Sequence, residues 1–67
     1  MNNNTFSYED LATMSDGIIA LINTALKAQL LVPDDKSREA IEEYLTRLHN
    51  LNAKICNEMG KFEKNEN

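Results

Sequence analysis

The chain has 67 residues and a formal net charge of −4, with one cysteine and one histidine. A chain of this length forms at most one small domain, whose core usually needs a disulfide, a metal or oligomerisation for support. A single cysteine, Cys56, excludes an internal disulfide, and His49 with Cys56 falls short of the four ligands of a zinc site. We therefore expect no metal and no cofactor, and we predict that another protein chain completes the core.

Charge and hydropathy also limit where the chain can act. An acidic chain repels nucleic acid rather than attracting it. No apolar run approaches the roughly 18 residues of a membrane span, and the beginning of the chain has no basic region followed by an apolar segment, as a secretion signal would. With one unpaired cysteine, these features predict a folded, cytoplasmic protein without a membrane segment.

The first predicted helix covers residues 8 to 31. Before it, residues 1 to about 6 are rich in asparagine and are expected to be mobile. Ser7 followed by Asp10 is a near match to a capping box, which places the start of the helix directly after Ser7. Gly17 costs about 1 kcal/mol relative to alanine inside a helix, but the apolar stripe stays in phase across it. We predict one continuous helix, with close packing against a neighbouring helix as the reason for the glycine; a break at this glycine is the alternative.

A turn over residues 32–35 follows. Pro33 ends the first helix, because proline biases Val32 away from helical backbone angles. Asp34 or Asp35 is expected to cap the second helix, where a negative charge also suits the helix dipole.

The second predicted helix covers residues 35 to about 59. Gly60 is well placed as the left-handed residue after its last turn, and Phe62 as a residue that folds back onto that end. Residues 63–67 are expected to form a polar, frayed tail. Since no strand pattern occurs, residues 1–67 are predicted to form a single all-α domain, an antiparallel two-helix hairpin.

The apolar side chains of the two predicted helices cover faces of different width. At 100° per residue, those of the second helix lie within roughly 140° and those of the first cover roughly 200°. A two-helix hairpin buries only one strip of each helix. If Leu21 and Met14 face the second helix, Ile19, Leu26 and Leu30 stay exposed. Each such side chain is worth roughly 1.5–3 kcal/mol on burial.

Self-association through a twofold axis covers such a face, and we therefore predict a homodimeric four-helix bundle. An obligate partner protein on the same face is the alternative. The predicted interface consists of apolar residues from both helices, namely Ile18, Ile19, Leu21, Ile22, Leu26, Leu30, Leu48, Leu51 and Ile55.

Two amides interrupt the apolar faces. Asn52 lies between Leu48 and Ile55, and Gln29 lies in line with Ile18 and Ile22. A polar residue in a helical seam can set the register of packing. We expect instead that both amides lie at an end or edge of the bundle, where water reaches them, and a register-setting role is the alternative.

Catalytic chemistry is not expected. His49 and Cys56 lie seven residues apart, about 10.5 Å along a helix, which is too far for a nucleophile and its base. The sequence has no phosphate-binding loop, metal motif or nucleophile elbow. Its basic residues alternate with acidic ones instead of clustering, which argues against nucleic acid as a partner.

Short stretches resemble a known family. Arg47-Leu48-His49-Asn50, followed by Ile55 and Cys56, is similar to the second helix of the Rop-like plasmid copy-number regulators, and the length, acidity and short acidic turn of the chain are similar as well. The resemblance implies an antiparallel homodimeric bundle. Members of that family bind RNA through basic, amide and aromatic residues on the outside of the first helix. Here that surface offers Asp16, Ala20, Asn23, Thr24 and Lys27, with one positive charge and no aromatic ring, so no RNA-binding residues are assigned.

The sequence thus predicts a non-enzymatic protein-interaction module. We expect a homodimeric regulatory or adaptor protein that binds itself and another protein. A partner-dependent subunit or small chaperone is the first alternative, and a Rop-like RNA-binding regulator is the second.

Overall fold

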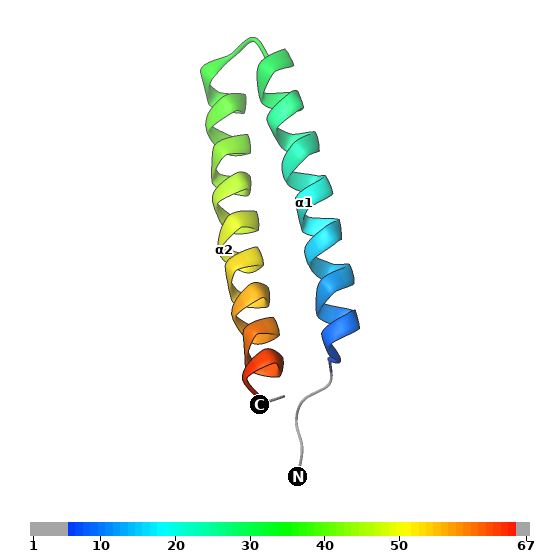
Figure 1. Ribbon diagram of the computed structural model, residues 1–67. Coiled ribbons are helices and arrows are strands. Elements are labelled where there is room, and N and C mark those ends of the chain that lie inside the picture. Colours follow the sequence, from blue (N-terminus) through cyan, green and yellow to red (C-terminus); the bar gives the residue numbers. More distant parts are fainter. Residues whose placement is uncertain (1–5, 66–67) are drawn as a thin grey trace.

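The computed structural model describes residues 6–65, and the surroundings of side chains over residues 6–62. Two helices, α1 (Tyr8–Leu31) and α2 (Asp35–Asn65), run antiparallel and pack against each other along their length (Figure 1). The described part of the chain contains no strand, so the all-α hairpin is confirmed. The expected mobility of residues 1–5 lies outside the described residues, as does the end of the expected frayed tail, residues 66–67.

Local side-chain chemistry determines both ends of α1. The Ser7 hydroxyl accepts a hydrogen bond from the Asp10 N–H at 3.0 Å, and the Asp10 carboxylate accepts one from the Ser7 N–H at 3.1 Å. This capping box confirms the predicted start of the helix. At the other end Val32 is extended, as expected before a proline, and its N–H donates to the carbonyl oxygen of Ala28 at 3.2 Å.

Gly17 does not break α1, so the prediction of one continuous helix is confirmed. The predicted reason for the glycine is wrong within the hairpin. A Cβ atom built on Gly17 meets no other atom within 4 Å, so α2 makes no close approach at this point. The glycine lies at an open surface of the hairpin.

Asp34 caps α2. Its carboxylate accepts a hydrogen bond from the Ser37 N–H at 3.0 Å, and its carbonyl oxygen accepts one from the Arg38 N–H at 3.2 Å. The hydrogen bond from the Ser37 backbone, with a further one from the Ser37 side chain, lowers the pKa of the Asp34 carboxyl. The cap is therefore ionised at neutral pH, where it complements the helix dipole.

The predicted end of the second helix is wrong. α2 continues through Gly60, which has no left-handed φ, and reaches Asn65, so Phe62 does not fold back and residues 63–65 are helical. The continued helix packs Met59 and Phe62 against the core. The Phe62 ring also meets the Tyr8 ring edge to face, with centroids 6.0 Å apart. Packing of Phe62 against the core and against Tyr8 in the first turn of α1 offsets the unfavourable helix propensity of glycine.

The core is a single seam between the helices. Its buried members alternate along α1 and α2 at intervals of three, four and seven residues: Leu11, Ile18, Ile22, Ala25, Leu45, Leu48 and Ile55. Each keeps 5–8% of its surface exposed, and among the described residues no large side chain is completely enclosed. Two helices can surround a seam on two sides only, so this core stays thin.

Candidate interaction surface

The predicted interface residues fall into three groups. Ile18, Ile22, Leu48 and Ile55 are buried in the seam, where they join the two helices of one chain. Leu21 and Leu51 are about half exposed on one face of the hairpin. Ile19, Leu26 and Leu30 are exposed on the opposite flank of α1.

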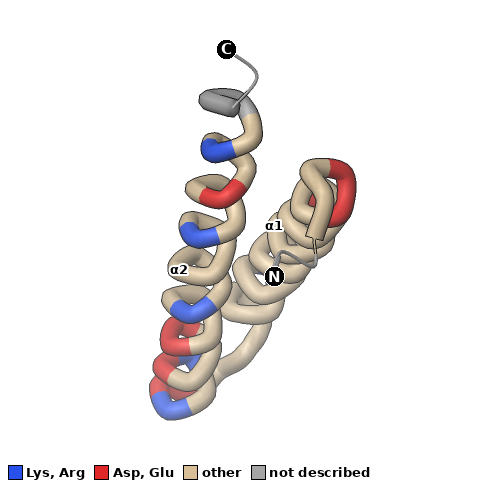
Figure 2. The backbone as a smooth tube through the Cα atoms, turned by 90° about the horizontal axis from the view of Figure 1, so that it is seen from below, with Lys and Arg blue, Asp and Glu red and all other residues tan. Residues whose placement is uncertain are grey.

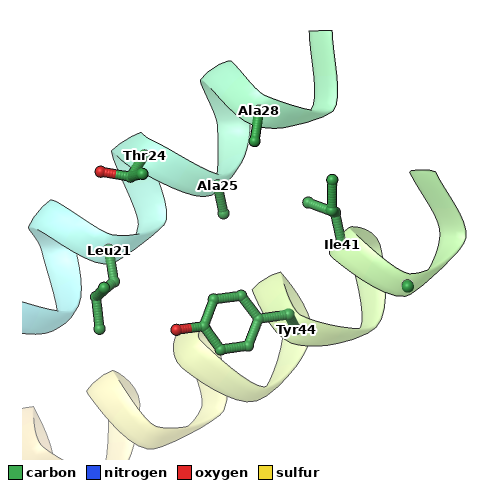
Figure 3. Close-up of a pocket in the computed structure, with 7 residues that line it drawn as sticks. Leu21, Thr24, Ala25, Ala28, Ile41 and Tyr44 are labelled. Carbon is green, nitrogen blue, oxygen red and sulfur yellow. The ribbon is translucent and has the colours of Figure 1, made fainter. Parts of the chain in front are cut away.

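The face with Leu21 and Leu51 is hollowed into two adjoining depressions. We call them together the apolar groove. The depression nearer the turn has a volume of about 430 Å³, and its lining side chains converge on the gap between the helices (Figure 3). The second depression has a volume of about 360 Å³. The first is lined by Leu21, Thr24, Ala25, Ala28, Ala40, Ile41 and Tyr44, and the second by Met14, Gly17, Ile18, Leu21, Leu51 and Ile55.

Leu21 belongs to both depressions and is 46% exposed. This differs from the expectation that Leu21 faces the second helix. The seam of α1 is centred instead on Leu11, Ile18 and Ile22, which moves Leu21 about 80° away from α2 at 100° per residue. Both flanks of α1 are consequently exposed, whereas the apolar pattern of the sequence predicts only one exposed flank.

Tyr44 was not among the predicted interface residues. It is 42% exposed, and its ring lies in the groove opposite Leu21 and Ala25 (Figure 3). Its spacing of seven residues from Leu51, which places both on one side of α2, is the signal that could have identified it.

The opposite flank of α1 forms a narrower surface. We call Ile19, Leu26 and Leu30 the apolar strip; Ile19 and Leu26 are 46% exposed and Leu30 is 86% exposed. On this side α2 contributes His49 and Cys56, which are both exposed. The strip is thus a feature of one helix, whereas the groove is built from two.

One polar contact crosses the seam. The Ser15 hydroxyl donates a hydrogen bond to the Asn52 side-chain oxygen at 2.7 Å, and Ser15 is buried. Asn52 therefore lies within the seam and not at a solvent-exposed end of the hairpin. Ser15 was not singled out in the sequence, although its position four residues after Leu11 and three before Ile18 places it on the buried stripe.

Charge is distributed unevenly between the helices. Acidic and basic residues follow the outside of α2 over most of its length, whereas α1 is largely uncharged after its first turn (Figure 2). Its stretch from Gly17 to Leu26 contains no charged residue at all. The two described ion pairs, Asp35 with Arg38 and Glu58 with Lys61, are both on the exposed side of α2.

The described residues contain no cluster of three or more potential metal-binding side chains. A shallow depression on α2 is lined by Glu39, Glu42, Glu43 and Thr46, which face solvent. Over residues 6–65, neither helix combines the length and the sustained hydropathy that a membrane crossing requires. The apolar groove is therefore the most distinctive surface of the hairpin.

Comparison of the chain with models of protein families, with characterised proteins and with solved structures finds no match. The resemblance to Rop-like regulators stays a prediction.

Proposed function

We propose that this chain is a non-enzymatic protein-interaction module that dimerises into a four-helix bundle and acts as a regulatory or adaptor protein. The observation that supports this proposal is the apolar groove. Both helices leave apolar side chains on that face, which is the arrangement of half a bundle.

The energetics favour covering the groove. Leu21, Tyr44 and Leu51 are between 42% and 49% exposed. Removing the exposed half of each such side chain from water is worth about 1 kcal/mol per residue. Domains of this size have little stability to spare, because their core is small relative to their surface.

The size of the face matches one partner of a stable dimer. α1 has 24 residues and is about 36 Å long, and the hairpin is 19 Å wide. The outline of the hairpin on this side is on the order of 700 Å², so the hairpin is large enough to supply the roughly 800 Å² of accessible surface that each protein contributes to a standard interface. A second copy of the hairpin offers a face of the same size and hydropathy.

The first experiment is the solution mass by light scattering over a dilution series, with helicity recorded on the same samples. We expect a species of about 15 kDa, twice the 7.6 kDa of one chain, that loses helix only when it dissociates. A helical species of 7.6 kDa at every concentration contradicts self-association.

A matched pair of leucine variants locates the interface. Leu21 lies in the groove and Leu30 in the apolar strip, and both are exposed residues of α1. We expect Leu21→Gln to dissociate the dimer and Leu30→Gln to leave its mass unchanged. The reverse result assigns the dimer interface to the strip.

The apolar strip supports one alternative, a subunit or small chaperone whose exposed residues are covered by a different protein. Ile19, Leu26 and Leu30 lie along one side of α1 at spacings of seven and four residues, as a helix-binding surface would. This alternative predicts a monomer whose helicity rises when the partner is added. The dilution series separates it from the dimer.

A further inference from the structure

We infer that the second copy enters the apolar groove with its own α1, so that the two α1 helices cross at Gly17 and the two α2 helices lie at the outer edges. This inference rests on the proposed self-association. It specifies which helix is central and where the two backbones come closest.

The two borders of the groove differ in charge. Beyond Gly17 and Leu21, the outer border of α1 continues with Thr13, Ala20 and Thr24, which are exposed and uncharged. Beyond Tyr44 and Leu51, the border of α2 continues with Arg47, Lys54 and Glu58, which are exposed and charged. The uncharged surface therefore extends past α1 and ends at α2.

In a twofold-symmetric dimer, each border either packs against the same border of the second copy or stays outside the interface. If the α2 borders met, the charged groups of Arg47, Lys54 and Glu58 would lose water on both copies. If the α1 borders meet, the side chains buried between Gly17 and Leu26 are uncharged, and the charges of Asp10 and Lys27 lie beyond the two ends of this stretch. The charge pattern thus favours a second copy shifted toward α1.

Gly17 marks the place of closest approach. It lines the groove between Met14 and Leu21, and a Cβ atom there meets nothing within 4 Å in the hairpin. Its backbone is helical with no left-handed φ, so the turn geometry of the chain does not require a glycine. Because Gly17 lies in the groove, the lack of a side chain there leaves room for the close approach of another backbone.

Gly60 supplies a matched control. It is also helical, and a Cβ atom there also meets nothing within 4 Å, but it lies on α2 outside the groove. Replacement of either glycine by alanine therefore has room in the hairpin and raises helix propensity. Only the change at Gly17 is expected to affect association.

The test compares dimer dissociation constants and helicity for the native chain, Gly17→Ala, Gly17→Leu and Gly60→Ala. Overpacking at a close helix contact is expected to raise the dissociation constant at least about tenfold for Gly17→Ala and about a hundredfold for Gly17→Leu. Gly60→Ala is expected to leave it unchanged. At concentrations above its own dissociation constant, each Gly17 variant is expected to recover the native helicity, which distinguishes weakened association from lost folding.

Two outcomes separate this inference from the proposed function. A native chain that is monomeric throughout overturns self-association and the crossing with it. A native dimer that Gly17→Leu leaves intact or tightens, while Leu21→Gln dissociates it, keeps the groove as interface and overturns the crossing at Gly17.

Thiol cross-linking gives an independent measurement of which helix is central. In a Cys56→Ser background, Ala20→Cys places a thiol on the outer border of α1 and Arg47→Cys places one on that of α2. With a short bismaleimide we expect the Ala20→Cys protein to form covalent dimers and the Arg47→Cys protein to remain monomeric on a denaturing gel. The reverse pattern overturns the arrangement.

Discussion

The two helices of the hairpin contribute similar buried stripes but have different outer surfaces. α2 exposes charged residues over most of its outside, with Tyr44 and Leu51 as large apolar residues on one flank. α1 has only one basic residue, Lys27, and exposes large apolar side chains on both flanks of its stripe. The outside of α2 is thus suited to contact with water. α1, by contrast, has more apolar surface than α2 can cover.

This difference explains how a hairpin can be folded and still incomplete. The seam buries one side of each helix. It leaves Tyr44 and Leu51 as the large exposed apolar residues of α2, whereas α1 keeps more apolar side chains exposed on both flanks. Most of the remaining apolar side chains on α1 lie in the groove and the apolar strip, and Leu31 is exposed beside the turn. An assembly with α1 inside and α2 outside would bury the exposed apolar side chains of α1 and keep the charged side chains of α2 in water.

The largest effects are expected in the seam, where the two helices should respond alike. Ile18 in α1 and Leu48 in α2 are 7% and 6% exposed. Ile18→Ala and Leu48→Ala should each lower the free energy of unfolding by about 2–5 kcal/mol through lost burial and a cavity. Urea denaturation followed by circular dichroism measures this. Full native stability in either variant would remove that residue from the seam.

A smaller effect is expected where the seam is polar. Ser15→Ala leaves the half-buried Asn52 side-chain oxygen without its 2.7 Å partner and should cost about 1–3 kcal/mol. The double variant Ser15→Ala/Asn52→Leu has no polar group left to satisfy and should recover most of that loss. If the single variant is as stable as the native chain, the hydrogen bond does not contribute to the hairpin.

The helix starts allow a comparison of two caps. Ser7→Ala removes the hydroxyl that accepts the Asp10 N–H and should cost about 1 kcal/mol. We expect a lower thermal midpoint of unfolding. In hydrogen exchange, we expect faster exchange of amide protons only in the first turn of α1. Ser7→Asp, which keeps an acceptor at the same position, should restore the midpoint.

The smallest effect concerns pH and is specific to α2. Because the pKa of Asp34 is lowered in the folded chain, the ionised cap stabilises the fold above the ordinary aspartate pKa, near 4, and this contribution is lost as the pH falls through the lowered value. The thermal midpoint of the native chain should therefore fall toward that of Asp34→Asn between about pH 5 and pH 2. A constant difference between the two proteins across this range would show that the charge has no role.

Features with local causes were predictable from the sequence. Ser7 with Asp10 and Pro33 with Asp34 act over three or four residues, so the start of α1, its end and the start of α2 follow from short-range hydrogen bonds and proline geometry. Apolar spacing of three and four residues was sufficient to predict two helices and their antiparallel packing. The existence of an apolar surface too wide for one hairpin followed from the same spacing.

Only the tertiary structure decided where each helix surface points and where α2 ends. Gly60 has the local signature of a helix end, but packing of Phe62 against the core and against Tyr8 favours the continued helix, and no short-range rule contains those contacts. The choice of Leu11, Ile18 and Ile22 over Leu21 for the seam depends on the opposing side chains of α2. The Ser15–Asn52 bond joins residues 37 positions apart. Sequence periodicity determines how wide an apolar face is, whereas the part of that face that is buried is determined by the helix that packs against it.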